Sequence, residues 1–75
     1  MAGEQRNGMI TITLNGEVRQ VPRGLTVGGL LGHLELNERM VVVERNREIV
    51  RRGRYEEVRV AEGDAIELVH FVGGG

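Results

Sequence analysis

The dipeptide Asn15-Gly16 lies between two short runs in which apolar and polar residues alternate. In the first run, Ile10, Ile12 and Leu14 are separated by threonines, and this period of two is typical of a half-buried β-strand. Asn-Gly tolerates the positive φ angles of a type I′ turn, which joins antiparallel strands tightly. The sequence therefore predicts that the fold begins with a β-hairpin over residues 9–21.

A single stretch of the chain has helical periodicity. Val27, Leu30, Leu31 and Leu34 fall at i, i+3, i+4 and i+7, and Thr26 precedes them as an N-cap. Three glycines within this stretch each cost up to about 1 kcal/mol of helix propensity relative to alanine. The helix is therefore expected to form because its leucines pack on a sheet.

Three further extended segments are predicted. β-Branched residues at 40–44 predict an interior strand, which a turn at 45–47 joins to a short strand at 48–50. Residues 66–71 predict the last strand. One amphipathic helix that crosses a mixed sheet of four to five strands buries both apolar faces. The predicted fold class is therefore α+β, with one domain at residues 9–71.

The two ends depart from this pattern. Residues 1–8 carry no apolar periodicity and are expected to form a flexible leader. Residues 72–75 are expected to form a flexible C-terminal tail, since Gly73 and Gly74 have no side chains to pack. An extended glycine strand can thread a narrow channel, so the tail is predicted to deliver the carboxylate of Gly75 into the active site of another protein.

Composition excludes several classes of function. Ten arginines nearly balance eleven acidic residues, leaving a net charge of −1, and this disfavours a nucleic-acid partner. The longest apolar run, residues 40–43, is too short for a membrane span. Serine, lysine and cysteine are absent, so the usual covalent nucleophiles cannot be assembled and the chain is not expected to be an enzyme. The lack of cysteine also fits a cytoplasmic location.

Other chemically active residues are expected to have structural roles only. His33 and His70 lie too far apart in the sequence to predict a metal site, and His33 is expected at the surface. Tyr55 is expected to pack at the edge of the core. The arginines at 51–54 are expected to form a solvated face balanced by acidic neighbours. Asn15-Gly16 is expected to have no role beyond its turn.

The terminal carboxylate needs activation before it can react, because an ionised carboxylate is a poor electrophile. Adenylation by ATP would give it AMP as a leaving group, and a sulfur nucleophile could then produce a thiocarboxylate on Gly75. All catalytic groups for these steps could belong to a partner protein.

From Met9 to Gly75 the sequence resembles the ThiS family of sulfur carriers in thiamine biosynthesis, which have a ubiquitin-like β-grasp fold. The resemblance rests on Asn15-Gly16, LTVGGLLGHL at 25–34, the turn at 46–50 and GDAIELVHFVGGG at 63–75. It implies adenylation of Gly75 by an E1-like ATP-dependent enzyme, sulfur supplied by a donor protein, and a thiazole synthase as acceptor. It also implies a monomer that binds no cofactor itself, the ATP being used by the activating enzyme.

Docking on a partner is predicted to use the outer face of the sheet beside the tail. Alternation along the last strand places every second residue on the face away from the core. A small exposed apolar patch there is a reasonable partner-binding surface. Alternatively, the phenylalanine folds back and caps the domain's own core. The predicted partner-binding residues are Val42, Val69, Phe71 and Val72.

Three other functions stay open at this point. Related β-grasp carriers with a glycine ending supply sulfur for molybdopterin or for tRNA thiolation. A ubiquitin-like protein modifier would use the same carboxylate chemistry. A passive protein-interaction module would bind through its sheet surface and would not need Gly75.

Overall fold

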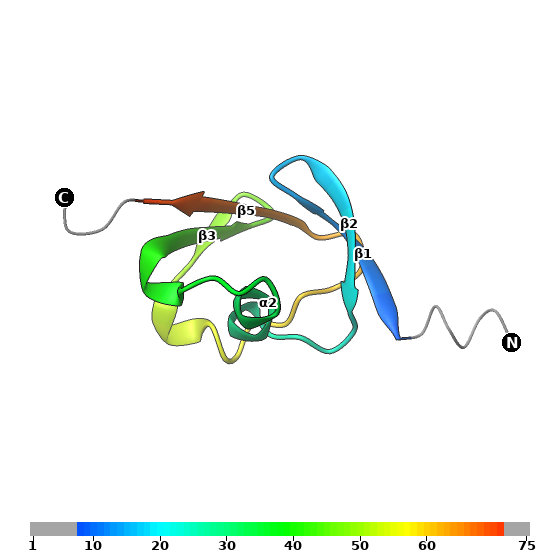
Figure 1. The fold of residues 1–75 in the computed structure, drawn as a ribbon, viewed down its shortest axis with the longest axis horizontal. Helices are drawn as coiled ribbons and strands as arrows, with labels where there is room; N and C mark the ends of the chain where they lie inside the picture. Colours follow the sequence, from blue (N-terminus) through cyan, green and yellow to red (C-terminus); the bar gives the residue numbers. More distant parts are fainter. Residues whose placement is uncertain (1–7, 72–75) are drawn as a thin grey trace, which may run out of the picture.

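The computed structural model describes residues 8–71, and these form a five-stranded mixed sheet with one α-helix on one of its faces (Figure 1). The strand order is β2-β1-β5-β3-β4; β1 and β5 are parallel and all other neighbours are antiparallel. The predicted α+β class, with a mixed sheet and one helix, is therefore confirmed. The elements are β1 (Met9–Leu14), β2 (Glu17–Pro22), α2 (Val27–His33), β3 (Val41–Arg45), β4 (Glu48–Val50) and β5 (Ala65–His70), with 3-10 turns at Glu38–Met40 and Arg52–Arg54.

The predicted hairpin is present as β1 and β2. Asn15 and Gly16 have φ angles of 50° and 84°, as a type I′ turn requires. The register opposes Leu14 to Glu17 and Ile10 to Val21. Ile10, Ile12 and Leu14 of β1 are buried in one cluster with the apolar residues of α2, so they lie on the face that packs against the helix.

The predicted helix is also present, and it begins and ends for identifiable reasons. The Thr26 hydroxyl oxygen accepts a hydrogen bond from the Gly29 amide at 3.0 Å, which confirms the N-cap. The predicted apolar stripe faces the sheet, since Val27, Leu30 and Leu31 are buried.

The end of α2 is a Schellman motif. The amide of Glu35 donates to the Gly32 carbonyl at 3.0 Å, and the amide of Leu36 donates to the Leu31 carbonyl at 2.9 Å. Glu35 has a φ angle of 62°, a left-handed conformation that glycine usually occupies at this position. The chain can then turn back so that Leu36 packs against the core.

Two predicted strands are displaced by one residue. Met40 belongs to a 3-10 turn rather than to β3, because Asn37 caps that turn by accepting a hydrogen bond from the Arg39 amide at 2.9 Å. The last strand begins at Ala65 and ends at His70, so Phe71 lies just beyond it. Both shifts keep the predicted alternation of buried and exposed residues.

The core lies between α2 and the inner face of the sheet. Branched aliphatic side chains dominate it, and Tyr55 is its one buried aromatic residue among those described, as predicted. Its members are Ile10, Ile12, Leu14, Val21, Val27, Leu30, Leu31, Val41, Val43, Val50, Tyr55, Val60 and Ile66.

Candidate functional site

Strand β5 runs through the centre of the sheet, with β1 on one side and β3 on the other. The last cross-strand pair of β5 with β3 is His70 with Val41. One further hydrogen bond follows, in which the Phe71 amide donates to the Met40 carbonyl at 3.0 Å. The end of β5 lies on the opposite side of the molecule from the start of β1 (Figure 1). The chain therefore approaches its C-terminal residues from a strand that β3 pairs with from Ile66 to His70 and that β1 pairs with only at Ala65 and Ile66.

Asn15 supports β5 beyond the end of β1. Its side-chain oxygen accepts a hydrogen bond from the Leu68 amide at 2.8 Å, and its side-chain nitrogen donates to the Leu68 carbonyl at 3.3 Å. The backbone amide of Asn15 donates to the Ile66 carbonyl at 2.9 Å. The Asn15 side chain thus takes the place of a further β1 backbone residue in the hydrogen-bond ladder between β1 and β5. The prediction that Asn15-Gly16 has no role beyond its turn is wrong, since the partner lies 53 residues away and leaves no signal in local sequence.

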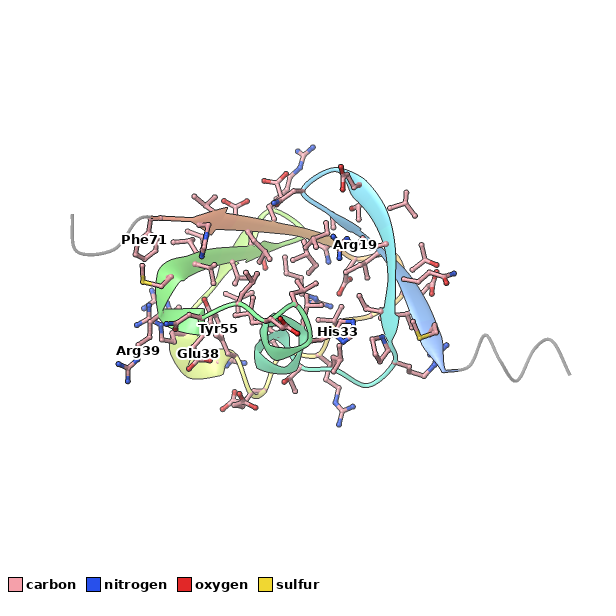
Figure 2. All side chains as sticks on the ribbon, in the orientation of Figure 1. Arg19, His33, Glu38, Arg39, Tyr55 and Phe71 are labelled. Carbon is pink, nitrogen blue, oxygen red and sulfur yellow. The ribbon has the colours of Figure 1, made fainter. Side chains whose placement is uncertain are left out.

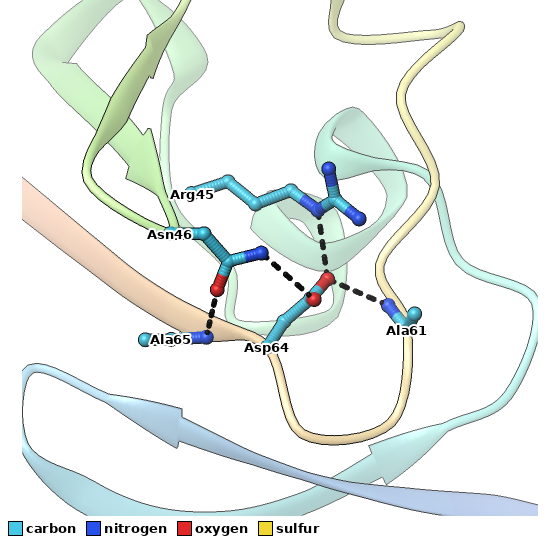
Figure 3. A network of polar contacts seen from close by, with 5 residues as sticks. All are labelled: Arg45, Asn46, Ala61, Asp64 and Ala65. Atoms are coloured by element: carbon cyan, nitrogen blue, oxygen red, sulfur yellow. Dashed lines mark hydrogen bonds and ion pairs between the residues drawn. The ribbon is translucent and has the colours of Figure 1, made fainter.

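Asp64 fixes the start of β5 (Figure 3). Its buried carboxylate accepts hydrogen bonds from Arg45 Nε at 2.7 Å, from the Ala61 amide at 2.8 Å and from Asn46 Nδ2 at 3.1 Å. Asn46 in turn accepts a hydrogen bond from the Ala65 amide at 2.9 Å. Burial alone would raise the pKa of Asp64, but these hydrogen bonds and the charge of Arg45 outweigh it and hold the pKa below its usual value. Asp64 lies 19 and 18 residues from Arg45 and Asn46 in the sequence, so local patterns do not indicate this network.

The predicted partner-binding residues that the structure describes lie near the end of β5. Val42 and Val69 are direct cross-strand partners, with 39% and 57% of their surfaces exposed. Phe71 is 43% exposed and lies at the end of β5 (Figure 2). The remaining predicted site residues, Val72, Gly73, Gly74 and Gly75, lie outside the described residues, as do the predicted tail and residues 1–7 of the predicted leader.

The residues expected to have structural roles lie where they were predicted. His33 is exposed on α2, and Arg54 pairs with Glu57 at 2.7 Å on the surface. Tyr55 is buried, and this burial, with a smaller contribution from Glu38, raises the pKa of its hydroxyl despite the nearby charge of Arg52. Figure 2 shows His33 and Tyr55 on the helix side of the sheet.

Residues 8–71 lack two features that would indicate other classes of protein. Within them, no three histidine or acidic side chains lie together as metal ligands. No helix in the same part of the chain has the length and apolar character needed to cross a membrane.

A hairpin followed by one helix and a mixed sheet, with the last strand inserted at the centre, defines a ubiquitin-like β-grasp protein. The crystal structure of the thiamine biosynthesis protein ThiS from Geobacter metallireducens superposes with a TM-score of 0.76 and 35% sequence identity, covering 88% of this chain and all of that one. The model of the ThiS family matches residues 12–75. The chain belongs to the ThiS family, which confirms the resemblance inferred from its sequence.

Curated relatives agree with this assignment. The sulfur carrier protein ThiS of Bacillus subtilis is 50% identical over 50 residues, which cover 67% of this chain and 76% of that protein. A thiazole synthase of Paramagnetospirillum magneticum is 47% identical over 64 residues, or 85% of this chain. A thiazole synthase of Magnetococcus marinus is 48% identical over the same number of residues. The chain spans 20% of the length of each of these two synthases.

Proposed function

We propose that this protein carries sulfur as a thiocarboxylate on Gly75 and donates it for formation of the thiazole ring in thiamine biosynthesis. The observation that carries the proposal is membership of the ThiS family, whose model extends through the three terminal glycines. The named function of the Bacillus relative, a sulfur carrier, supports the same role.

The choice of thiazole synthase as acceptor has its own support. Two proteins named thiazole synthase contain a segment similar to 85% of this chain. A carrier segment and a synthase in one polypeptide fit a carrier that delivers its sulfur to that enzyme. No comparable observation favours molybdopterin or tRNA thiolation, protein modification or a passive docking role.

The described structure suits a carrier because it holds the base of the reactive segment in place. Asp64 fixes the start of β5, and Asn15 fixes its second half through Leu68. An extended chain advances about 3.3 Å per residue, so the five residues after His70 can reach about 16 Å from the sheet. The acyl carbon of Gly75 can therefore enter a partner's active site while the folded domain stays outside it.

The proposed chemistry has two steps, and the catalytic groups for both belong to partner enzymes. A carboxylate oxygen of Gly75 attacks the α-phosphorus of ATP and pyrophosphate leaves, which gives an acyl adenylate. Hydrosulfide, HS⁻, then attacks the acyl carbon, AMP leaves and one proton is released, which gives the thiocarboxylate. Activation is required because the carboxylate, with a pKa of about 3.5, is ionised at neutral pH.

Intact-mass spectrometry tests the proposal. The purified chain is incubated with ATP, the E1-like activating enzyme of the same organism and sodium sulfide, and the expected product is heavier by about 16 Da because one oxygen is replaced by sulfur. The product is then supplied to the thiazole synthase, and thiazole formation is measured. Carriers for molybdopterin or tRNA would gain the mass but would not support this last step.

Two truncated chains serve as the test and its control. Removal of Gly75 should abolish the mass increase, whereas removal of residues 1–8, which lie outside the family match, should leave it intact. An intact chain that gains no mass under these conditions, or a chain without Gly75 that still supports thiazole formation, contradicts the proposal.

A further inference from the structure

Three arginines from successive segments line one pocket at the β4 edge of the sheet. Arg45 ends β3, Arg51 follows β4 and Arg54 ends the second 3-10 turn. The pocket has a volume of about 300 Å³, which lies at the lower end of the range for small-molecule sites. It contains none of the predicted partner-binding residues, so the proposed function gives it no role. Its remaining lining residues are Glu48, Ile49, Val50 and Val58.

Arg45 is the cation in this pocket whose position the fold already fixes. Its Nε donates to the Asp64 carboxylate at 2.7 Å, and the side chains of Arg45 and Asp64 are 33% and 7% exposed. A guanidinium carries five N–H donors, and this bond uses one of them. Within residues 8–71, the two terminal nitrogens of Arg45 form no hydrogen bond (Figure 3). The fold thus holds a cation in place and leaves its remaining donors for a ligand, which lowers the entropy cost of binding.

Arg51 and Arg54 add two cations that are exposed to solvent. Among the described residues, the Arg51 side chain has neither a hydrogen bond nor an ion pair. Arg54 Nε pairs with Glu57 at 2.7 Å, but both side chains are more than half exposed, and such surface pairs contribute little. Neither Glu57 nor Asp64 lines the pocket. Three guanidinium groups therefore share its described lining with one carboxylate, that of Glu48.

We propose that this pocket binds the phosphate group of a small phosphomonoester. A phosphate presents three terminal oxygens that accept charge-assisted hydrogen bonds, so it can contact three guanidinium groups at once. A carboxylate has only two oxygens and one negative charge. Arg45 provides the fixed contact through its terminal nitrogens, and Arg51 and Arg54 bind the other oxygens.

The apolar lining favours an ester over inorganic phosphate. Val50 is buried and Val58 is half-buried, while Ile49 is 66% exposed at the rim of the pocket. An aromatic or aliphatic group bonded to the phosphate can cover these side chains and release water from them. Glu48 repels the anion and limits the affinity, so we expect a Kd of about 1 mM for a simple ester.

The pocket can be occupied while the C-terminal residues are bound elsewhere. Arg45 lies at one end of β3, and Val41, at the other end, pairs with His70. At about 3.3 Å per residue, Arg45 lies about 13 Å along β3 from that pair. The inference therefore goes beyond the proposed function and does not depend on it.

NMR titration of the full chain at constant ionic strength tests the inference, with inorganic phosphate, phenyl phosphate and acetate as probes. Both phosphates should shift the amide signals of residues 45, 48–51, 54 and 58 and the Nε–H signal of Arg45 in a saturable way. Phenyl phosphate should bind at least about threefold more tightly than inorganic phosphate, because its ring covers apolar surface. Acetate should bind at least about fivefold more weakly than phenyl phosphate, because it has one charge and two oxygens.

Glutamine variants test the two exposed arginines, while Arg45 is left intact because its substitution would also disturb the buried network. Arg51→Gln and Arg54→Gln should each raise the Kd for phenyl phosphate at least about threefold, and the double variant at least about tenfold. Arg52→Gln is the matched control, since Arg52 lies between them, carries the same charge and does not line the pocket. It should change the Kd less than about twofold. Glu48→Gln should lower the Kd, because it removes the one carboxylate of the described lining.

Thermal unfolding accompanies each titration, and the Tm of these surface variants should stay within about 4 °C of that of the unmodified chain. The absence of saturable shifts at the pocket signals up to about 10 mM of either phosphate overturns the inference. Equal affinity for acetate and phenyl phosphate overturns the assignment to phosphate. An equal rise in Kd for Arg52→Gln and Arg51→Gln also overturns the site, since the effect would then come from net charge. None of these results bears on the mass increase that tests the sulfur-carrier function.

Discussion

Replacing Asn15 by glycine or aspartate separates its turn from its contact with β5. Glycine adopts the φ angle of 50° without strain and so retains the type I′ turn, but it removes both hydrogen bonds to Leu68. Each such bond contributes about 0.5–1.5 kcal/mol net, and Asn15 is exposed, so the expected loss for Asn15→Gly is about 1–2 kcal/mol. Asn15→Asp keeps the acceptor for the Leu68 amide but brings a carboxylate near the Leu68 carbonyl, so we expect a loss of about 0.5–1 kcal/mol.

Two measurements test this prediction. In thermal unfolding, each kcal/mol should lower the Tm by about 4–8 °C for a domain of this size. In amide hydrogen exchange, Leu68 should lose protection in Asn15→Gly and retain most of it in Asn15→Asp, because only the aspartate still accepts its amide hydrogen. Unchanged stability and unchanged Leu68 exchange in the glycine variant would refute the role of Asn15 in holding β5.

Three further predictions concern other positions. Gly32→Ala should raise the free energy of unfolding by about 0.5–1 kcal/mol in chemical denaturation, because Gly32 is helical and an added methyl group meets open space. Gly28→Ala should raise it less, since its methyl group would contact the Glu56 side chain. An equal rise in both variants would contradict this explanation. The lowered pKa of Asp64 means that its contribution to stability is complete above the usual value of 3.8 and is lost as pH falls through the folded-state pKa. Asp64→Asn should therefore be less stable at neutral pH and should lose less additional stability between pH 5 and pH 2 in an acid titration of the Tm; parallel titrations would count against the network. Phe71→Ala should weaken adenylation and leave the Tm nearly unchanged. A large fall in Tm with unchanged adenylation would instead assign Phe71 to the core.

Local sequence patterns predicted most of the fold because hairpin turns, strand alternation and helix caps depend on neighbouring residues. Asn15-Gly16 and Thr26 are examples, and both have the predicted conformations. The strand predicted at 40–44 lies one residue later, at Val41–Arg45, because Asn37, outside the apolar run, caps the preceding 3-10 turn.

Contacts between distant parts of the chain could not be predicted in the same way. The bonds from Asn15 to Leu68 and from Asp64 to Arg45 and Asn46 depend on the order of strands in the sheet. The pocket that Arg45 shares with Arg51 and Arg54 likewise depends on the path of the chain after β4. For the candidate site, the sequence identified the exposed residues Val42 and Val69 through alternation, but not the hydrogen bonds through which Asn15 holds β5.

The parallel pairing of β1 with β5 joins the earliest strand of the chain to the latest, as in the pair Thr13 and Ala65. During synthesis the ribosome releases β5 after the other four described strands, so the sheet lacks its middle until β5 has emerged. A chain cut short before His70 would leave β1 and β3 without the strand that joins them. Folding of the sheet is thus coupled to the synthesis of β5, and molecules that reach the native state are those that also possess the strand that precedes the C-terminal glycines.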